Sequence, residues 1–454
     1  MCRKKEPLCF GIGAFICIEI YKKKSYTIDI NMYFVRVNVG GLIMEARDFE
    51  RLIRGKNINF LIGSGASTPL YPTLSLPVDI IGNDRCSLED IIAHPLLSEE
   101  RRMLLYLYYF LRWIKVMADE EYGNEDTEKK IVKSNYMRFI SAISNFLQTE
   151  GNERPKRINI FTTNYDLMFE WTLDKYIQDN SLIYFNDGSR GVFSKYIDSK
   201  NYNLNITHSG YYDRYTREIP TINLFKMHGS LSWVQQNDKI KVGLAEEIIK
   251  EADIAAKDIN VTILDIENLL KSSYCSDFES FIDNYNNYDL SKASESLIPL
   301  NIRQLEKFYN KYKSIAIINP NKYKFHDTVL EQHYYQMIRS FSYELEKKQS
   351  VLIVFGFSFA DEHIKSIFER SLSNPELQVF LISYSKESQD DLKNKFKDLA
   401  TACKCPKNIP ICVCGGVKKF EIITKKSIIP IDDELKNNNR AHSSKLRILE
   451  RILD

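Results

Sequence analysis

Four polar turns in the sequence each follow a short apolar run and carry residue types suited to nucleotide chemistry. The first is "GSGAST" at 63–68, after the apolar residues Ile58, Phe60, Leu61 and Ile62. Gly63 and Gly65 allow a ligand to approach the main chain closely, and a helix starting there would offer unpaired amides to a phosphate. The turn lacks the third glycine of the dinucleotide fingerprint and the Lys of a Walker motif. A tight strand-to-helix turn without a ligand is therefore the alternative.

The second and third turns supply a donor-acceptor amide and a titratable side chain. Asn164, in "TTNYD", can fix a ribose hydroxyl, although Asn is also a preferred helix cap. Asp166 stands at the expected start of a helix, where it binds a hydroxyl or complements the helix dipole. His228, in "HGS", titrates near neutrality and can act as a general base, the alternative being a hydrogen-bonded structural histidine.

The fourth turn, "GFSFAD" at 356–361, is expected to place Ser358 against a cofactor. A serine-hydrolase role is not expected, because the turn lacks the second glycine of a nucleophile elbow. We expect Asp361, Glu362 and His363 on the first turn of the following helix. The spacing of the other histidines forms no convincing metal triad.

The elements that must position these turns alternate between strands and helices. Strands are predicted at 158–161, 222–227 and 351–355, and "SIAIINP" and "LQVFLISY" are two further candidates. This alternation predicts a parallel, doubly wound sheet, in which ligands bind outside the carboxyl ends of the strands. Helical patterns fill two insertions, 87–150 and 243–312, and the polar piece 183–220 is predicted to form a loop or hairpin beside the site.

The composition excludes several classes of function. The 62 basic residues nearly cancel the 60 acidic ones, so neither direct nucleic-acid binding nor a membrane surface is expected. The nine cysteines are scattered and odd in number, and the apolar runs are too short to span a membrane. A reducing cytoplasmic location is therefore predicted.

Taken together, the four turns resemble the sirtuin family, in its bacterial branch of NAD-consuming anti-phage proteins. The resemblance covers about 56–385 and implies a sirtuin-like Rossmann-type α/β fold, a parallel sheet with large helical insertions. It implies NAD as substrate and Asn164 and His228 as catalytic residues. The implied cofactor-binding residues come from the first, second and fourth turns: Gly63, Ser64, Gly65, Ala66, Ser67, Thr163, Asp166, Gly356 and Ser358.

Two departures from the family bear on the reaction. "TPLYPTLSLPVD" has no Arg where deacetylating sirtuins carry a Pro-Asp-Phe-Arg segment, and the paired zinc cysteines after the catalytic His are missing. Cys403, Cys405, Cys412 and Cys414 form a C-x-C pair of pairs that could bind zinc or form a buried hairpin, and no metal is assigned. The resemblance thus implies an NAD hydrolase releasing nicotinamide and ADP-ribose. An NAD-dependent deacylase and a non-catalytic NAD or ADP-ribose sensor are the alternatives.

The resemblance also implies partners and a domain division. A HerA-type ring ATPase is expected to gate the activity, with the aromatic helices at 103–117 and 136–147 as interfaces. The chain is also expected to form a homo-oligomer, and gating by homo-oligomerisation alone is the alternative. Residues 1–43 are predicted to be an extension ahead of a native start at Met44, because a ribosome-binding site read through by mistake could encode the glycines before it. The catalytic domain is expected at 44–385, followed by a mildly basic C-terminal extension at 386–454.

Overall fold

The structure is a computed structural model of the chain. It describes the following residues: 36–39, 42–71, 76, 87–118, 127–151, 154–180, 182–236, 238–243, 246–294, 297, 300–317, 328–382, 391–392, 394–396, 421–422 and 449–450.

The centre of the molecule is a six-stranded sheet with the order β15-β14-β3-β4-β10-β5, and every neighbouring pair is parallel. Its strands are β3 (Asn57–Ile62), β4 (Arg157–Thr162), β5 (Tyr184–Asn186), β10 (Thr221–Lys226), β14 (Ser350–Phe355) and β15 (Gln378–Ile382). The strands predicted at 158–161, 222–227 and 351–355 are confirmed within one residue at each end. The fold class, an α/β protein with a Rossmann-type parallel sheet, is confirmed.

Helices cover both faces of this sheet, as its apolar strands require. On one face, Ile58, Phe60 and Ile62 join a core that includes residues of α5 (Thr127–Thr149) and α6 (Met168–Asp179). On the other face, Leu61 and Phe161 join a second core with residues of α12 (Thr328–Glu346) and α13 (Glu362–Ser371). Because side chains alternate along a strand, one apolar run supplies both cores.

An asparagine ladder crosses the sheet on the α12 face. Asn59, Asn159, Asn223 and Asn186 are register partners on four neighbouring strands. Each amide donates to the carbonyl oxygen of the next: Asn186 to Asn223 at 2.9 Å, Asn223 to Asn159 at 2.9 Å and Asn159 to Asn59 at 2.8 Å. Asn59 then donates to Ser350 Oγ of β14 at 3.1 Å. These polar side chains are buried yet partnered, and they define the register of the strands.

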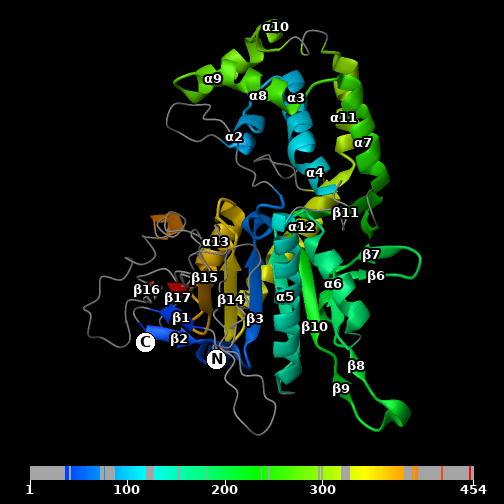
Figure 1. Ribbon diagram of the computed structural model, residues 1–454, viewed down its shortest axis with the longest axis vertical. Helices are drawn as coiled ribbons and strands as arrows, with labels where there is room; N and C mark the ends of the chain where they lie inside the picture. The colour runs from blue at the N-terminus through cyan, green and yellow to red at the C-terminus, as the bar shows by residue number, and fades with distance from the viewer. Residues whose placement is uncertain are drawn as a thin grey trace, which may run out of the picture.

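A second, five-stranded sheet lies beside the first, with the order β13-β11-β12-β7-β6. Its strands are β6 (Ser189–Arg190), β7 (Lys195–Ile197), β11 (Gly229–Gln236), β12 (Lys239–Val242) and β13 (Ile315–Ile317). The prediction that "SIAIINP" belongs with the parallel strands is wrong, because β13 pairs antiparallel with β11. β8 (Thr207–His208) and β9 (Arg217–Glu218) form a separate hairpin that projects at the amino end of β10 (Figure 1).

The two predicted insertions contribute a helical lobe that stands over the carboxyl ends of the strands (Figure 1). Its helices are α2 (Leu88–Ile92), α3 (Glu99–Tyr109), the π-helical turn Phe110–Ile114, α4 (Lys115–Ala118), α7 (Glu246–Ile259), α8 (Ile263–Ser272), α9 (Phe278–Asn287), α10 (Leu290–Ala293) and α11 (Ile302–Tyr312). Stacked aromatic rings such as Tyr106 and Tyr309 join α3 to α11. The first insertion also supplies α5, which belongs to the sheet layer.

The remaining elements are short. β1 (Arg36–Val39) and β2 (Leu42–Glu45) form an antiparallel pair ahead of α1 (Ala46–Ile53), and the predicted start Met44 lies in β2. β16 (Glu421–Ile422) pairs with β17 (Leu449–Glu450). The predicted domain boundaries stay predictions. Among the described helices, none combines the length and apolar character needed to cross a membrane.

Candidate functional site

The first and fourth loops are packed directly against each other through glycines. A Cβ on Gly63 would lie 2.3 Å from the carbonyl oxygen of Gly356, and one on Gly356 would lie 2.4 Å from the amide of Ala66. Gly356 also has a φ of 62°. Glycine is therefore required here for the contact between two loops.

This packing uses main-chain donors that were predicted to hold a phosphate. Gly63 N donates to Phe355 O at 3.2 Å, Gly65 N to Gly356 O at 3.0 Å and Ala66 N to Gly63 O at 3.0 Å. The prediction of a helix with unpaired first amides directly after this loop is wrong. A single 3₁₀ turn, η1 (Ser64–Ser67), takes its place, and Thr68 is extended, as a residue before a proline prefers.

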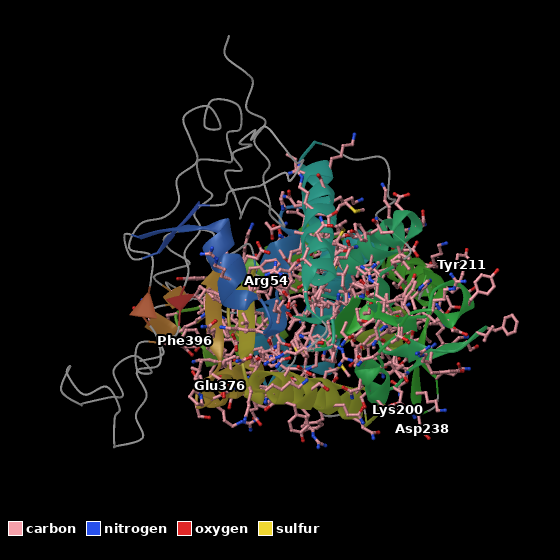
Figure 2. All side chains as sticks on the ribbon, turned by 90° about the horizontal axis from the view of Figure 1, so that it is seen from below. Arg54, Lys200, Tyr211, Asp238, Glu376 and Phe396 are labelled. Atoms are coloured by element: carbon pink, nitrogen blue, oxygen red, sulfur yellow. The ribbon has the colours of Figure 1, made fainter. Side chains whose placement is uncertain are left out.

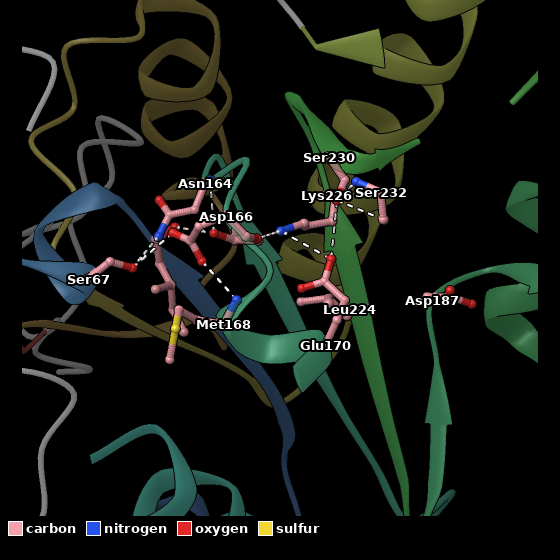
Figure 3. A network of polar contacts seen from close by, with 12 residues as sticks. Ser67, Asn164, Asp166, Met168, Glu170, Asp187, Leu224, Lys226, Ser230 and Ser232 are labelled. Carbon is pink, nitrogen blue, oxygen red and sulfur yellow. Dashed lines mark hydrogen bonds and ion pairs between the residues drawn. The ribbon is translucent and has the colours of Figure 1, made fainter. Parts of the chain in front are cut away.

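The first and second loops share a buried hydrogen-bond network (Figure 3). Ser67 Oγ donates to Asp166 Oδ2 at 2.9 Å and lies 2.7 Å from the hydroxyl of Tyr136. Burial, and next the charge of Asp166, raise the pKa of Tyr136 well above its usual value. Asp166 Oδ1 accepts from the amide of Met168 at 3.1 Å, at the start of α6. Asp166 was predicted to stabilise the start of a helix, and it does so by this bond.

Asn164 sits at the centre of this network with half of its amide group engaged. Its Nδ2 donates to Gly63 O at 3.2 Å and to Ser67 Oγ at 3.4 Å. Its Oδ1 is buried and accepts no hydrogen bond from the residues that the structure describes. Because a buried acceptor without a donor costs free energy, this atom is suited to a hydroxyl or amine of a ligand.

A buried lysine links the second loop to β10. Lys226 is 1% exposed. Its Nζ donates to the carbonyl oxygen of Asp166 and forms an ion pair with Glu170 Oε1 at 3.2 Å (Figure 3). Burial raises the pKa of Glu170, and the nearby Lys226 opposes that rise. The sequence analysis missed both residues, although a lone Lys ending the apolar run of β10 was an available signal.

His228, from the third turn, meets the fourth loop. Its Nε2 lies 3.0 Å from Asp361 Oδ2, and His228 is 9% exposed. The other carboxylate oxygen of Asp361 accepts the amides of His363 and Ile364 at 3.0 and 3.1 Å, so Asp361 caps α13. The placement of this acidic cluster at the first turn of a helix is confirmed. The contact with His228 was missed, because only the folded sheet brings the two turns together.

The other predicted site residues have less defined places. Thr163 donates its amide to Ile62 O at 3.4 Å, and Ser64 and Ser358 are exposed. Lys395 Nζ donates to the carbonyl oxygen of Ser358 at 2.8 Å. No cluster of three or more metal-ligand side chains occurs within the described ranges. Cys403, Cys405, Cys412 and Cys414 lie outside those ranges.

The helical lobe closes on this site through tyrosines. Burial is the main cause that raises the pKa of two hydroxyls, those of Tyr109 in α3 and Tyr165 in the second loop, and each hydroxyl also affects the pKa of the other. The lobe therefore covers the second loop at Tyr165, whereas Ser64 and Ser358 of the first and fourth loops are exposed. Whether the predicted residues bind a cofactor stays a prediction.

Comparison with known proteins gives one family match. Residues 355–452, about a fifth of the chain, match the MraW methylase family. The chain is 81% identical over 77 residues to the ribosomal RNA small subunit methyltransferase H of Fusobacterium nucleatum, covering 17% of this chain and 24% of that protein. The enzyme of the same name from Lachnospira eligens is 40% identical over 79 residues, covering 17% and 25%. The one from Caldicellulosiruptor saccharolyticus is 40% identical over 93 residues, covering 20% and 30%. The chain thus spans about a quarter of the length of these curated relatives.

These matches overturn the identity expected from the four turns. The family match is to methylases and the relatives are methyltransferases, so the assignment to NAD-consuming sirtuin-like proteins is wrong. The same matches contradict the predictions that depended on that assignment: NAD hydrolysis, its deacylase and sensor alternatives, NAD as substrate, the anti-phage role and the HerA-type partner. The expectation of no nucleic-acid partner also conflicts with relatives named for ribosomal RNA. The physical reason is that short glycine turns at strand ends recur among α/β proteins whose ligands differ.

Proposed function

We propose that this chain acts in methyl transfer from S-adenosylmethionine to small-subunit ribosomal RNA. The observation that carries the proposal is the 81% identity over 77 residues with a methyltransferase named for that RNA. Because the chain spans a quarter of that relative, the substrate and the cofactor are both part of the proposal. A reaction on ribosomal RNA also agrees with the predicted cytoplasmic location.

The fold supports the proposal at one specific place. The family match begins at Phe355, the last residue of β14, and therefore includes Gly356 and Asp361. Gly356 packs against Gly63, and Asp361 pairs with His228. The matched range thus contributes to the same loop cluster as the first three turns, at the carboxyl ends of parallel strands where such folds bind nucleosides.

The residues present fit a nucleoside with a positively charged group. Asn164 Oδ1 is a buried acceptor that a ribose hydroxyl can satisfy. The carboxylates of Asp166 and Asp361 favour a cation nearby. S-adenosylmethionine supplies a methyl group on a positively charged sulfur. His228, oriented by Asp361, is placed to take the proton that an RNA nucleophile gives up on methylation.

The experiment is transfer of a tritiated methyl group from S-adenosylmethionine to ribosomal RNA by the purified full-length chain. The substrate is small ribosomal subunits from cells that lack methyltransferase H. We expect labelled RNA from the unaltered protein. Absence of both labelled RNA and measurable S-adenosylmethionine binding would refute the proposal.

Two variants separate binding from chemistry. Asn164→Leu removes the buried acceptor, and we expect about tenfold weaker S-adenosylmethionine binding, equivalent to about 1.4 kcal/mol. His228→Gln should leave binding within twofold and slow transfer about a hundredfold, as for loss of a general base. The matched control is His208→Gln, on the exposed hairpin, which should change neither. Equal activity of the His228 and His208 variants would remove His228 from the site.

A further inference from the structure

A pocket lies at the opposite end of the parallel sheet, where the strands begin. Three segments form it: the turn before β3 with Gly55 and Lys56, the end of α5 with Phe146 and Glu150, and the approach to β4 at 154–157. Figure 2 shows the molecule from below, the side of this end, and labels Arg54 of the same turn. Because β3 and β4 are each six residues long, the pocket is about 20 Å from the loop cluster at the carboxyl ends.

Lys156 is the unusual residue of this pocket. It lines the pocket and is 7% exposed. Its backbone carbonyl accepts from Thr221 N at 2.7 Å, but within the described ranges its ammonium group makes no hydrogen bond or ion pair. Lysines as little exposed as this one are normally paired. The Lys156 ammonium has no counter-ion among the described residues and still touches solvent, so it can receive an anion.

Two arginines next to Lys156 add positive charge to the pocket, because neither is paired with a carboxylate of the described residues. Arg154 donates to the amide oxygen of Gln349, and Arg157 donates to Leu204 O and Asn205 Oδ1, all neutral acceptors. Burial lowers the pKa of Arg157, and its buried Nε has no partner among the described residues. The acid lining the pocket, Glu150, is paired with Arg54, although its buried Oε1 accepts no hydrogen bond from the described residues.

Glu150 and Arg54 bind each other and the main chain at this end of the sheet. Glu150 Oε2 accepts the amide of Gly55 at 2.9 Å, and its Oε1 lies 3.5 Å from Arg54 Nη1. Arg54 also donates to the carbonyl oxygen of Thr149 at 3.1 Å, which satisfies the end of α5. Helix capping and neutralisation of Glu150 thus fall to Arg54. Neither role requires the ammonium group of Lys156.

The size of the pocket limits the anion. Its volume is about 40 Å³, several times what one water needs, and its apolar wall includes Ile58 and Phe146. A phosphoryl group fits this space, whereas a base or a sugar must remain outside. A phosphoryl group also offers several acceptor oxygens to Lys and Arg donors that converge from different sides.

We propose that this pocket binds the phosphoryl group of a phosphate-containing anion, with the Lys156 ammonium as its central contact and Arg154 and Arg157 at its rim. A free phosphate and the backbone of an RNA strand offer the same chemistry. The site is separate from the loop cluster at the carboxyl ends and does not depend on the methyl-transfer proposal.

The test is calorimetric titration of the full-length chain with inorganic phosphate at constant ionic strength, with chloride as the balancing anion. We expect saturable binding that weakens at least tenfold in Lys156→Gln. The matched control is Lys195→Gln, an exposed lysine of the second sheet, and it should bind as the unaltered protein does. Arg154→Gln, at the rim, should weaken binding about threefold and serves if the Lys156 variant does not fold.

A second arm identifies the source of the phosphate. If RNA backbone is the natural ligand, a single-stranded ribonucleotide 12-mer competes with inorganic phosphate, and the competition is lost in Lys156→Gln. If a small phosphate is the ligand, the 12-mer leaves phosphate binding unchanged. No saturable binding of phosphate, or equal binding by the Lys156 and Lys195 variants, overturns the proposal. The readout is binding heat, so a failure of methyl transfer would not affect it.

Discussion

Two buried lysines stand at opposite ends of neighbouring strands, and their surroundings differ. Lys226 ends β10 and is 1% exposed, with an ion pair to Glu170 and a hydrogen bond to Asp166 O. Lys156 directly precedes β4 and is 7% exposed, with no partner for its ammonium group in the part of the chain that the structure describes. The first charge, on Lys226, is paired within the protein and stabilises the fold, and we call such a residue part of the framework. The second charge, on Lys156, is available to bind a ligand.

The same contrast holds for the two ends of the sheet as a whole. At the carboxyl end, glycines, amides and carboxylates bond one another, and Asn164 Oδ1 is a buried acceptor that receives no hydrogen bond from the described residues. At the amino end, Arg154 and Arg157 line a cavity and donate to neutral oxygens. The carboxyl end is thus suited to a ligand that donates a hydrogen bond. The amino end is suited to one that brings negative charge.

The largest effect expected is that of Lys226→Met. Removal of the lysine leaves Glu170 without its counter-ion, and the free energy of unfolding should fall by about 4 kcal/mol near neutral pH, as when a buried pair loses one partner. The measurement is urea unfolding. A loss below about 1 kcal/mol would show that Lys226 is not part of the framework.

The pH dependence gives this prediction a second check. The pKa of Glu170 is raised by burial, so its folded state holds the proton more tightly than the unfolded state does. Stability linked to Glu170 is therefore lost as the pH rises through the raised pKa. Without Lys226 that pKa rises further, and the variant should lose more at about pH 8 than at about pH 5. The double variant Lys226→Met with Glu170→Gln should show no such difference.

A smaller loss is expected for Gly356→Ala. The new Cβ would meet the Ala66 amide at 2.4 Å, in a backbone conformation with a φ of 62°. Overpacking and the left-handed conformation together should cost about 3 kcal/mol, measured by urea unfolding. Gly243→Ala is the control, because no atom lies within 4 Å of its added Cβ. Equal stability of the two variants would contradict the direct packing of the first and fourth loops.

The smallest effect, and one of opposite sign, is expected for Lys156→Met. Replacing a largely buried lysine that has no counter-ion among the described residues with an apolar side chain of similar length should raise the free energy of unfolding by about 1 kcal/mol in phosphate-free buffer. Phosphate should stabilise the unaltered protein and not the variant, since a ligand stabilises only the state that binds it. A loss comparable to that of Lys226→Met would mean that Lys156 is a framework residue too.

The sequence predicted the parallel sheet well because buried strands are short, continuous apolar runs bounded by polar turns. It could not assign β13 to the second sheet, since "SIAIINP" is as apolar as a parallel strand and only its partner β11 distinguishes it. It also missed the asparagine ladder, although "NIN", "RIN" and "TIN" open β3, β4 and β10 alike. Polar residues inside apolar runs look unfavourable until their register partners are known.

The candidate site was predicted in part for the same reason. Strand ends in a parallel sheet gather on one edge, so Ser67, Asn164 and Asp166 could be expected together, and they share one network. The pairing of His228 with Asp361 depends on how far each loop reaches. The identity of the ligand could not be inferred, because glycine-containing turns at strand ends indicate where a ligand binds but not which ligand it is. The family match at 355–452 includes the fourth turn and none of the first three.

The amide dipoles of the asparagine ladder add up to a net dipole that runs across the strands of the sheet. Every amide donates toward β14 and accepts from the side of β5, so the side-chain dipoles of Asn186, Asn223, Asn159 and Asn59 lie head to tail. Reversing one amide would set two NH₂ groups or two carbonyls against each other, so the four can reverse only as a group. Each bond polarises the next, which strengthens the row as a unit. The row runs across the strands, whereas a helix carries its dipole along its own axis.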